Sequence, residues 1–142
     1  MNPTIEKFGY PATLLRELDH WLVLLRPAQA TLGALVLAAK SEATAFADLP
    51  AGAFAELHIA IGAIERGLAA FRAFERINYL MLMMVDRQVH FHVLPRYSET
   101  QNWDGVDFPD RGRPGPPQLG DAVTLGDARI KQLVSELAHS LN

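Results

Sequence analysis

The sequence predicts an α+β protein in which an antiparallel sheet of about five strands packs one face on a long helix, with a second helix at the C-terminal end. Short segments rich in Leu, Val and aromatic residues, bounded by Pro, Gly or Asp, predict two strand hairpins, at 20–38 and 78–94. Between them, residues 51–76 place apolar side chains at spacings of three and four, the period of a helix with one buried face. The chain of 142 residues is expected to form a single domain, 1–142.

The segments before the long helix carry signals for both helix and strand. Asn2 is a good helix cap and Pro3 a favoured first helical residue. The segment 20–25 is rich in Trp, Leu and Val, as expected of a buried strand. We therefore predict a short helix at 3–7, strands at 13–17, 20–25 and 33–38, a turn at 27–32, and a hairpin between the second and third strands.

The middle of the chain is expected to hold two helices and a second hairpin. Ser41 would cap a short helix ending at Asp48, and Leu49-Pro50 would separate it from the long helix. The expected buried stripe of the long helix is Phe54, Leu57, Ile61, Ile64, Leu68 and Phe71. The hairpin would join strands at 78–85 and 88–94 through a turn at Asp86-Arg87.

The composition changes after the second hairpin. Residues 98–120 are rich in Pro and Gly, which predicts an irregular segment without helix or strand. Trp103 and Phe108 are large apolar residues within it, so the segment should be held against the body of the protein. A last helix, capped by Thr124 or Asp127, should end near Leu141. Its expected apolar face is Ile130, Leu133, Val134 and Leu137.

Charge and composition exclude several classes of function. The net charge of −3 argues against a nucleic-acid-binding protein, although a small nucleotide needs only local donors. The longest apolar stretches are too short to span a membrane, and residues 1–7 lack the apolar core of a secretory signal. The absence of cysteine excludes disulfides and thiolate chemistry and is compatible with a cytoplasmic location.

The stretch 88–97 carries the pattern that points to chemistry. Polar and apolar residues alternate from Gln88 to Val93, so a strand would display Gln88, His90 and His92 on one face and anchor itself through the other. The two imidazoles would lie about 7 Å apart along the strand. Imidazole can act as nucleophile, acid, base or metal ligand near neutral pH.

This stretch, Gln-Val-His-Phe-His-Val-Leu, resembles the signature of the histidine triad (HIT) family, in which three histidines alternate with apolar residues. Gln88 replaces the first histidine of that triad. The Pro95-Arg96 pair and the segments 8–11, 20–33 and 77–86 are also similar to a bacterial branch of the family, in the order in which a HIT domain would place them. The resemblance implies a HIT-like fold, usually as a homodimer.

The resemblance also implies an activity. HIT enzymes hydrolyse or transfer nucleotides at the α-phosphate, and the middle triad position, here His90, would be the nucleophile. His92 would donate to a phosphate oxygen or pass a proton to the leaving group, and Gln88 would position phosphate without carrying a charge. The implied partner is a purine nucleotide or nucleotide conjugate, with no cofactor. Leu22, Leu24 or Leu35 would line the base pocket.

Two other functions remain open on the sequence. Gln88 is also what a noncatalytic nucleotide-binding or interaction module with a degenerate triad would show. A His-x-His pair can instead bind a metal ion, but a metal-dependent hydrolase needs a third or fourth donor, and the motif contains no acidic residue.

Overall fold

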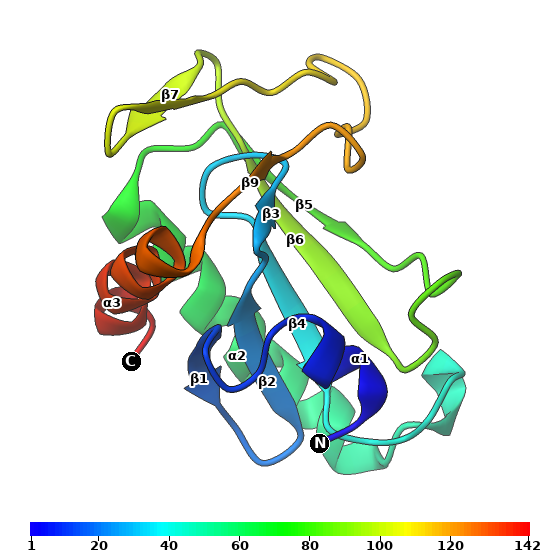
Figure 1. Cartoon of the computed structure of the whole chain (residues 1–142). Helices are drawn as coiled ribbons and strands as arrows, with labels where there is room; N and C mark the ends of the chain where they lie inside the picture. Colours follow the sequence, from blue (N-terminus) through cyan, green and yellow to red (C-terminus); the bar gives the residue numbers. More distant parts are fainter.

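A five-stranded antiparallel sheet forms the centre of the protein, whose structure is a computed structural model that describes residues 1–142 (Figure 1). The strand order is β1-β2-β4-β6-β5, and every neighbouring pair is antiparallel. The strands are β1 (Leu14–Glu17), β2 (Trp21–Leu25), β4 (Leu35–Ala39), β6 (His90–Arg96) and β5 (Arg76–Leu80). The expected pairing of the second and third predicted strands is confirmed, because β2 and β4 pair along their whole length.

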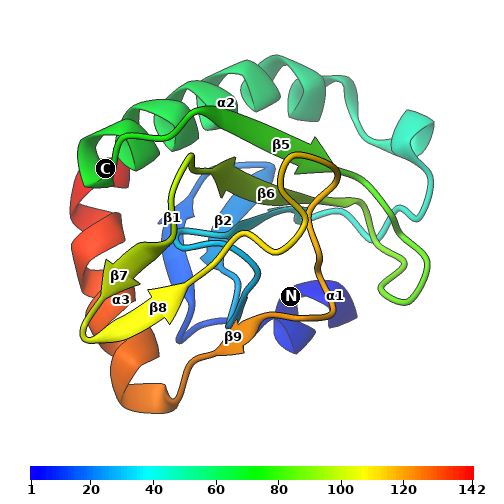
Figure 2. The same cartoon turned by 90° about the horizontal axis from the view of Figure 1, so that it is seen from above.

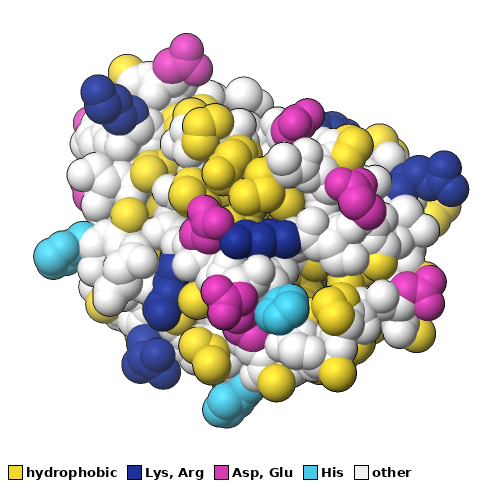
Figure 3. Space-filling model, turned by 90° about the horizontal axis from the view of Figure 1, so that it is seen from below, with side chains coloured by type: hydrophobic (Ala, Val, Ile, Leu, Met, Phe, Trp, Pro, Cys, Tyr) yellow, Lys and Arg dark blue, Asp and Glu magenta, His cyan; other side chains and the backbone are white.

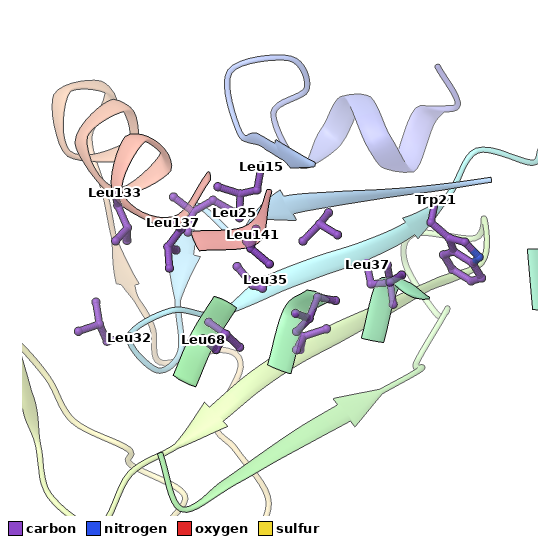
Figure 4. Packing of buried hydrophobic residues seen from close by; sticks show 14 of the residues in the cluster. Leu15, Trp21, Leu25, Leu32, Leu35, Leu37, Leu68, Leu133, Leu137 and Leu141 are labelled. Carbon is purple, nitrogen blue, oxygen red and sulfur yellow. The ribbon is translucent and has the colours of Figure 1, made fainter. Parts of the chain in front are cut away.

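Two helices cover one side of this sheet. The long helix α2 (Ala51–Phe71) runs along the sheet, and α3 (Asp127–Leu141) packs against α2 and β1 (Figure 2). Leucines from the sheet and from both helices converge between these layers, where Figure 4 shows Leu35, Leu68 and Leu137 pointing toward one another. All three are buried. This cluster is the main hydrophobic core.

The short helix α1 (Pro3–Lys7) lies on the opposite side of the sheet (Figure 2). The predicted cap is confirmed, because the side-chain oxygen of Asn2 accepts a hydrogen bond of 3.0 Å from the backbone of Ile5. The amide group of Asn2 donates to the carbonyls of Ala39 and Ser41, at 2.9 Å each. One buried side chain therefore begins α1 and fixes it to the end of β4.

The region before α2 differs from the prediction. The expected helix over Ser41–Asp48 is wrong, since only Phe46–Asp48 form a single 3₁₀ turn, η1. The Ser41 hydroxyl accepts a hydrogen bond of 3.0 Å from the backbone of Ala43, which closes a local turn instead of capping a helix.

The long helix is shorter than predicted. Its expected apolar stripe is confirmed except at Phe54, because Ile64 and Leu68 are buried and the other three residues pack against the core. The helix ends at Phe71 because Arg72 has extended backbone angles, and β5 begins at Arg76. Phe54 is 41% exposed and packs on Phe46 outside the core. The buried positions are Ala53, Ala60, Ala63, Ile64, Gly67 and Leu68. Small side chains allow the helix to approach its neighbours closely, which apolar spacing alone did not reveal.

Regular structure also occurs where none was expected. Within the Pro/Gly-rich segment, β7 (Gln101–Trp103) and β8 (Val106–Phe108) form a hairpin, and the predicted burial of Trp103 and Phe108 is confirmed. Within the predicted turn at 27–32, β3 (Ala28–Gln29) pairs with β9 (Val123–Thr124).

The ends of two further elements were misplaced. Gly126 occupies the cap position of α3 and offers no capping side chain, so neither Thr124 nor Asp127 caps this helix. The strand expected at 78–85 ends at Leu80, and residues 81–89 form the connection to β6. The helices of the protein are too short or too polar to cross a membrane.

Candidate active site

The strand β6 turns its two histidines away from the main core, as the alternation predicted. Val89 and Val93 are fully buried in the core beneath α2. His90 and His92 face the side covered by α1. Across the sheet, His90 is level with Ala38 and Leu22, and His92 is level with Val36 and Leu24. Apolar side chains therefore form the floor on which both imidazoles rest.

Phe8, which follows α1, holds both histidines in place. Its ring centroid lies 5.7 Å from that of His90 and 5.8 Å from that of His92. The two imidazole centroids are 5.1 Å apart, with their planes nearly perpendicular. His90 is 1% exposed and His92 6% exposed. These contacts restrict both rings to one orientation.

A backbone carbonyl fixes the protonation pattern of His90. Its Nδ1 lies 2.7 Å from the carbonyl oxygen of Gln88. A carbonyl oxygen only accepts, so Nδ1 carries the proton and donates, and the neutral ring keeps a lone pair on Nε2. That nitrogen is the one available for nucleophilic attack or for accepting a proton.

His92 is held in its neutral form. Burial, the positive charge of Arg26 and the neighbouring His90 together lower the pKa of His92 to about 4. Its Nδ1 is buried without a hydrogen-bond partner, which leaves Nε2 as the nitrogen free to contact a ligand. A neutral imidazole with the proton on Nε2 can donate one hydrogen bond there without carrying a charge.

The two histidines line a cavity of about 360 Å³. Its other walls come from α1, from the end of β2 and from the connection between β5 and β6: Lys7, Phe8, Arg26, Leu82, Met83, Met84, Val85 and Asp86. Lys7 and Asp86 form an ion pair of 2.6 Å that joins α1 to this connection. The cavity thus combines polar groups with an apolar rim, a combination common in ligand sites.

Gln88 lies outside this cavity. It comes just before β6, and its side chain lines an adjoining hollow of about 340 Å³ together with Thr4, Lys7 and Arg87. The Thr4 hydroxyl donates to the side-chain oxygen of Gln88 over 2.7 Å. Gln88 therefore contacts His90 through its backbone and α1 through its side chain.

Solved structures with a similar fold are histidine triad proteins. The structure of such a protein from Bradyrhizobium japonicum matches with a TM-score of 0.72, 17% identity, and coverage of 100% of this chain and 97% of that chain. A histidine triad protein from Sinorhizobium meliloti matches with a TM-score of 0.70 and 20% identity, over 99% of this chain and 95% of that chain. A hypothetical histidine triad nucleotide-binding protein from Sulfolobus tokodaii matches with a TM-score of 0.70 and 15% identity, over 97% of this chain and 89% of that chain. The chain has the histidine triad fold. No protein-family model and no curated protein matches it.

The expected base pocket of this histidine triad fold is wrong in its residues. Leu22, Leu24 and Leu35 are fully buried, and none of them lines a cavity. Leu22 and Leu24 pack beneath Ile5 and Phe8, and Leu35 belongs to the main core on the other side of the sheet. The apolar walls are instead Phe8 and the connection 82–85.

Arg26 also lines the cavity, although it was not among the residues predicted for the site. A signal for it existed, because Leu22, Leu24 and Arg26 follow the same alternation along β2, which places Arg26 on the histidine face. The sequence did not reveal the order of the strands, and it is this order that brings the end of β2 to the same cavity as β6.

The residues of the site do not form an evident metal centre. No group of three or more His, Asp and Glu side chains is placed to hold a metal ion anywhere in the chain. His90 and His92 alone provide two donors, and the Nδ1 of His90 is already occupied by a carbonyl.

Proposed function

We propose that this protein is a nucleotide hydrolase or nucleotidyl transferase that acts at the α-phosphate through a covalent nucleotidyl-histidine intermediate on His90. The observation that carries this proposal is the hydrogen bond from Nδ1 of His90 to the Gln88 carbonyl, which leaves a lone pair on Nε2. The histidine triad fold supports it, and one protein of that fold, from Sulfolobus tokodaii, is described as a hypothetical nucleotide-binding protein.

In the first step, the lone pair of His90 Nε2 would form a bond to the α-phosphorus. The bond from phosphorus to the leaving group breaks, and its electron pair departs with that group, which takes up a proton. In the second step, the oxygen of water or of another acceptor bonds to phosphorus and loses a proton. The phosphorus–nitrogen bond breaks, which returns His90 to its starting state. Two displacements of moderate difficulty replace one difficult displacement.

His92 and Gln88 would support these steps differently. The Nε2–H of His92 would donate to a nonbridging phosphate oxygen, where negative charge shifts in the transition state. It could also pass a proton to the leaving group. Gln88 would position phosphate or leaving group from the adjoining hollow, by its amide and without a charge.

The proposed substrates are purine nucleoside phosphoramidates, dinucleoside polyphosphates and related nucleotide conjugates. The mixed lining supports this class, because Phe8 and Met83 offer apolar surface to a flat base while the histidines address phosphate. We further propose that the protein acts as a homodimer in the cytoplasm and requires no cofactor.

Intact-protein mass spectrometry tests the covalent step. Wild type is mixed with an adenosine phosphoramidate or a diadenosine polyphosphate and quenched rapidly without acid, beside His90→Ala. His58→Ala, which changes an exposed histidine on α2, is the matched control. We expect one nucleoside monophosphate to be added to wild type and to His58→Ala but not to His90→Ala. Turnover should fall at least about a thousandfold when the nucleophile is removed.

The alternative is a noncatalytic nucleotide-binding module, which the replacement of a triad histidine by Gln88 favours. In that case wild type and His90→Ala would bind AMP alike, and neither would form an adduct or release product. Resistance of any activity to a chelator would separate both proposals from metal-dependent hydrolysis.

A further inference from the structure

Arg26 brings an uncompensated positive charge to the histidine cavity. The chain contains six ion pairs, and none of them includes Arg26. One terminal nitrogen of its guanidinium donates to the carbonyl of Ala28, whereas Nε is buried without any partner. The other cation at the cavity, Lys7, is paired with Asp86. The charge of Arg26 is therefore the one that the protein leaves available.

The arrangement of the strands explains how this arginine reaches the site. The backbone of Arg26 donates to the carbonyl of Ala34, which comes just before β4, two residues along the sheet from the row that contains Leu24 and His92. The two strands that carry Arg26 and His92 lie about 10 Å apart, with one strand between them. The side chain of Ala34, which lies between, is small and buried. A long arginine side chain can span that distance and present its guanidinium beside the histidines.

The placement is unfavourable for the free protein. Burial of a cation without a counter-charge is destabilising, and here burial lowers the pKa of Arg26. The charge of Arg26 also disfavours protonation of His92, whose pKa it helps to lower. An oxyanion bound in the cavity would provide the missing counter-charge, since it would pair with the guanidinium of Arg26.

We propose that Arg26 binds the oxygens of the substrate phosphate in this cavity, so that its fixed positive charge supplies what the neutral Gln88 and His92 lack. This assignment rests on the proposed function, because it takes the bound oxyanion to be the reacting phosphate of a nucleotide. Arg26 makes two hydrogen bonds to nonbridging oxygens and exchanges no proton, since its guanidinium stays protonated at neutral pH.

Binding measurements with AMP, adenosine and inorganic phosphate test this assignment. The variants are Arg26→Gln and Arg26→Lys, with Arg66→Gln, an exposed arginine on α2, as the matched control. We expect Arg26→Gln to lower the affinity for AMP about ten- to a hundredfold and to leave the affinity for adenosine unchanged. The AMP affinity of Arg26→Lys should lie between those of wild type and Arg26→Gln, because lysine keeps the charge but cannot make the two parallel hydrogen bonds of a guanidinium. An AMP affinity in Arg26→Gln equal to that of wild type overturns the assignment.

Thermal melting separates ligand binding from a structural role. Because Arg26→Gln removes an unpaired charge, its melting temperature should equal or exceed that of wild type. A large fall in melting temperature together with unchanged AMP affinity would make Arg26 a structural residue. A measurement on the wild-type protein needs no variant: the NMR signal of the Arg26 Nε–H should move on addition of AMP and stay in place with adenosine. An unmoved signal with bound AMP overturns the assignment.

The same experiment distinguishes failure of this assignment from failure of the proposed function. If wild type binds AMP and Arg26 makes no difference, the nucleotide function stands and the assignment fails. If wild type binds phosphate through Arg26 but shows no preference for AMP and no turnover, the cavity is an oxyanion site and the nucleotide function fails. If wild type binds neither phosphate nor AMP, both fail. Acetate in place of phosphate distinguishes a carboxylate ligand, which we expect to bind more weakly.

Discussion

Burial and charge act in the same direction on His92. The ring is 6% exposed and lies within the field of Arg26, so the neutral form is favoured in the folded protein. The unfolded chain would protonate this imidazole near pH 6.5, whereas the folded protein does so only near pH 4. Between these values the unfolded state binds more protons, so the free energy of unfolding must decrease as the pH falls.

We therefore expect His92 to make the protein sensitive to acid. The contribution of neutral His92 to the free energy of unfolding is complete above about pH 6.5. It is lost as the pH falls toward 4, and the loss is at most about 3 kcal/mol. Urea unfolding of wild type and His92→Gln at pH 7 and pH 4.5 measures it. Wild type should lose more stability than the variant, and the control His58→Gln should follow wild type. Parallel losses in wild type and His92→Gln would contradict the shifted pKa.

Gln88 offers the most direct test of what the missing histidine costs. Gln88→His would place a group that can carry a proton beside Thr4 and next to the histidine cavity. We expect turnover of an adenosine phosphoramidate to rise, because an imidazole can stabilise phosphate charge where an amide cannot. Gln118→His, at an exposed position in the Pro/Gly-rich segment, controls for the substitution. Unchanged turnover would mean that position 88 does not limit the rate.

The contact between α2 and α3 depends on the absence of a side chain at one helical position. A Cβ at Gly67 would lie 2.8 Å from Cγ of Leu141 and 3.2 Å from the carbonyl oxygen of Ser140. Both distances are shorter than a normal contact, so α3 would have to shift. At Gly62 on the same helix, a Cβ would meet only the side chain of Arg66, which is exposed and can move.

The two glycines should therefore respond in opposite ways to alanine. Gly62→Ala should stabilise the protein by up to about 1 kcal/mol, because alanine favours the helix. Gly67→Ala gains the same propensity but must relieve the clash with α3, which costs about 1–3 kcal/mol, so a net loss is expected. Thermal or urea unfolding of the two variants measures the difference. Equal shifts would show that the ends of α2 and α3 are not closely packed.

The two edges of the sheet differ in what covers them. The edge at β1 is bordered by the end of α3, where Asn142 donates to the carbonyl of Leu15 over 2.8 Å. The edge at β5 has no partner strand beyond it. The connection that follows β5 exposes Met84 by 85% and Val85 by 80%, where the sequence predicted a continuation of the strand. On the face in Figure 3, hydrophobic side chains gather in one patch bordered by charged residues.

We expect the protein to be a homodimer whose interface covers the exposed apolar side chains of Met84 and Val85. Light scattering coupled to size exclusion should give about twice the chain mass of 15.7 kDa. Met84→Glu should weaken the dimer if the connection lies in the interface, since burial of an unpaired charge is unfavourable. Ile59→Glu, which changes an exposed apolar residue on α2, is the control. A monomer mass for wild type at all concentrations would contradict the dimer.

Local periodicity in the sequence determined the elements that matter for the site. The alternation from Gln88 to Val93 predicted which faces of β6 the histidines and valines occupy, and this is what the structure has. Asn2 and Pro3 predicted α1, and the spacing of apolar residues predicted α2 and its buried face, apart from the end of the helix and Phe54. Such signals are reliable because they depend on backbone geometry within a few residues.

Only the tertiary structure decided how these elements combine into a site. It placed Phe8 on both imidazoles, set Nδ1 of His90 against the Gln88 carbonyl, and brought Arg26 to the cavity from two strands away. It also buried Leu22 and Leu24, which the sequence left as candidates for the base pocket. These contacts join residues far apart in the chain, so they depend on strand order and side-chain packing, which no local pattern encodes.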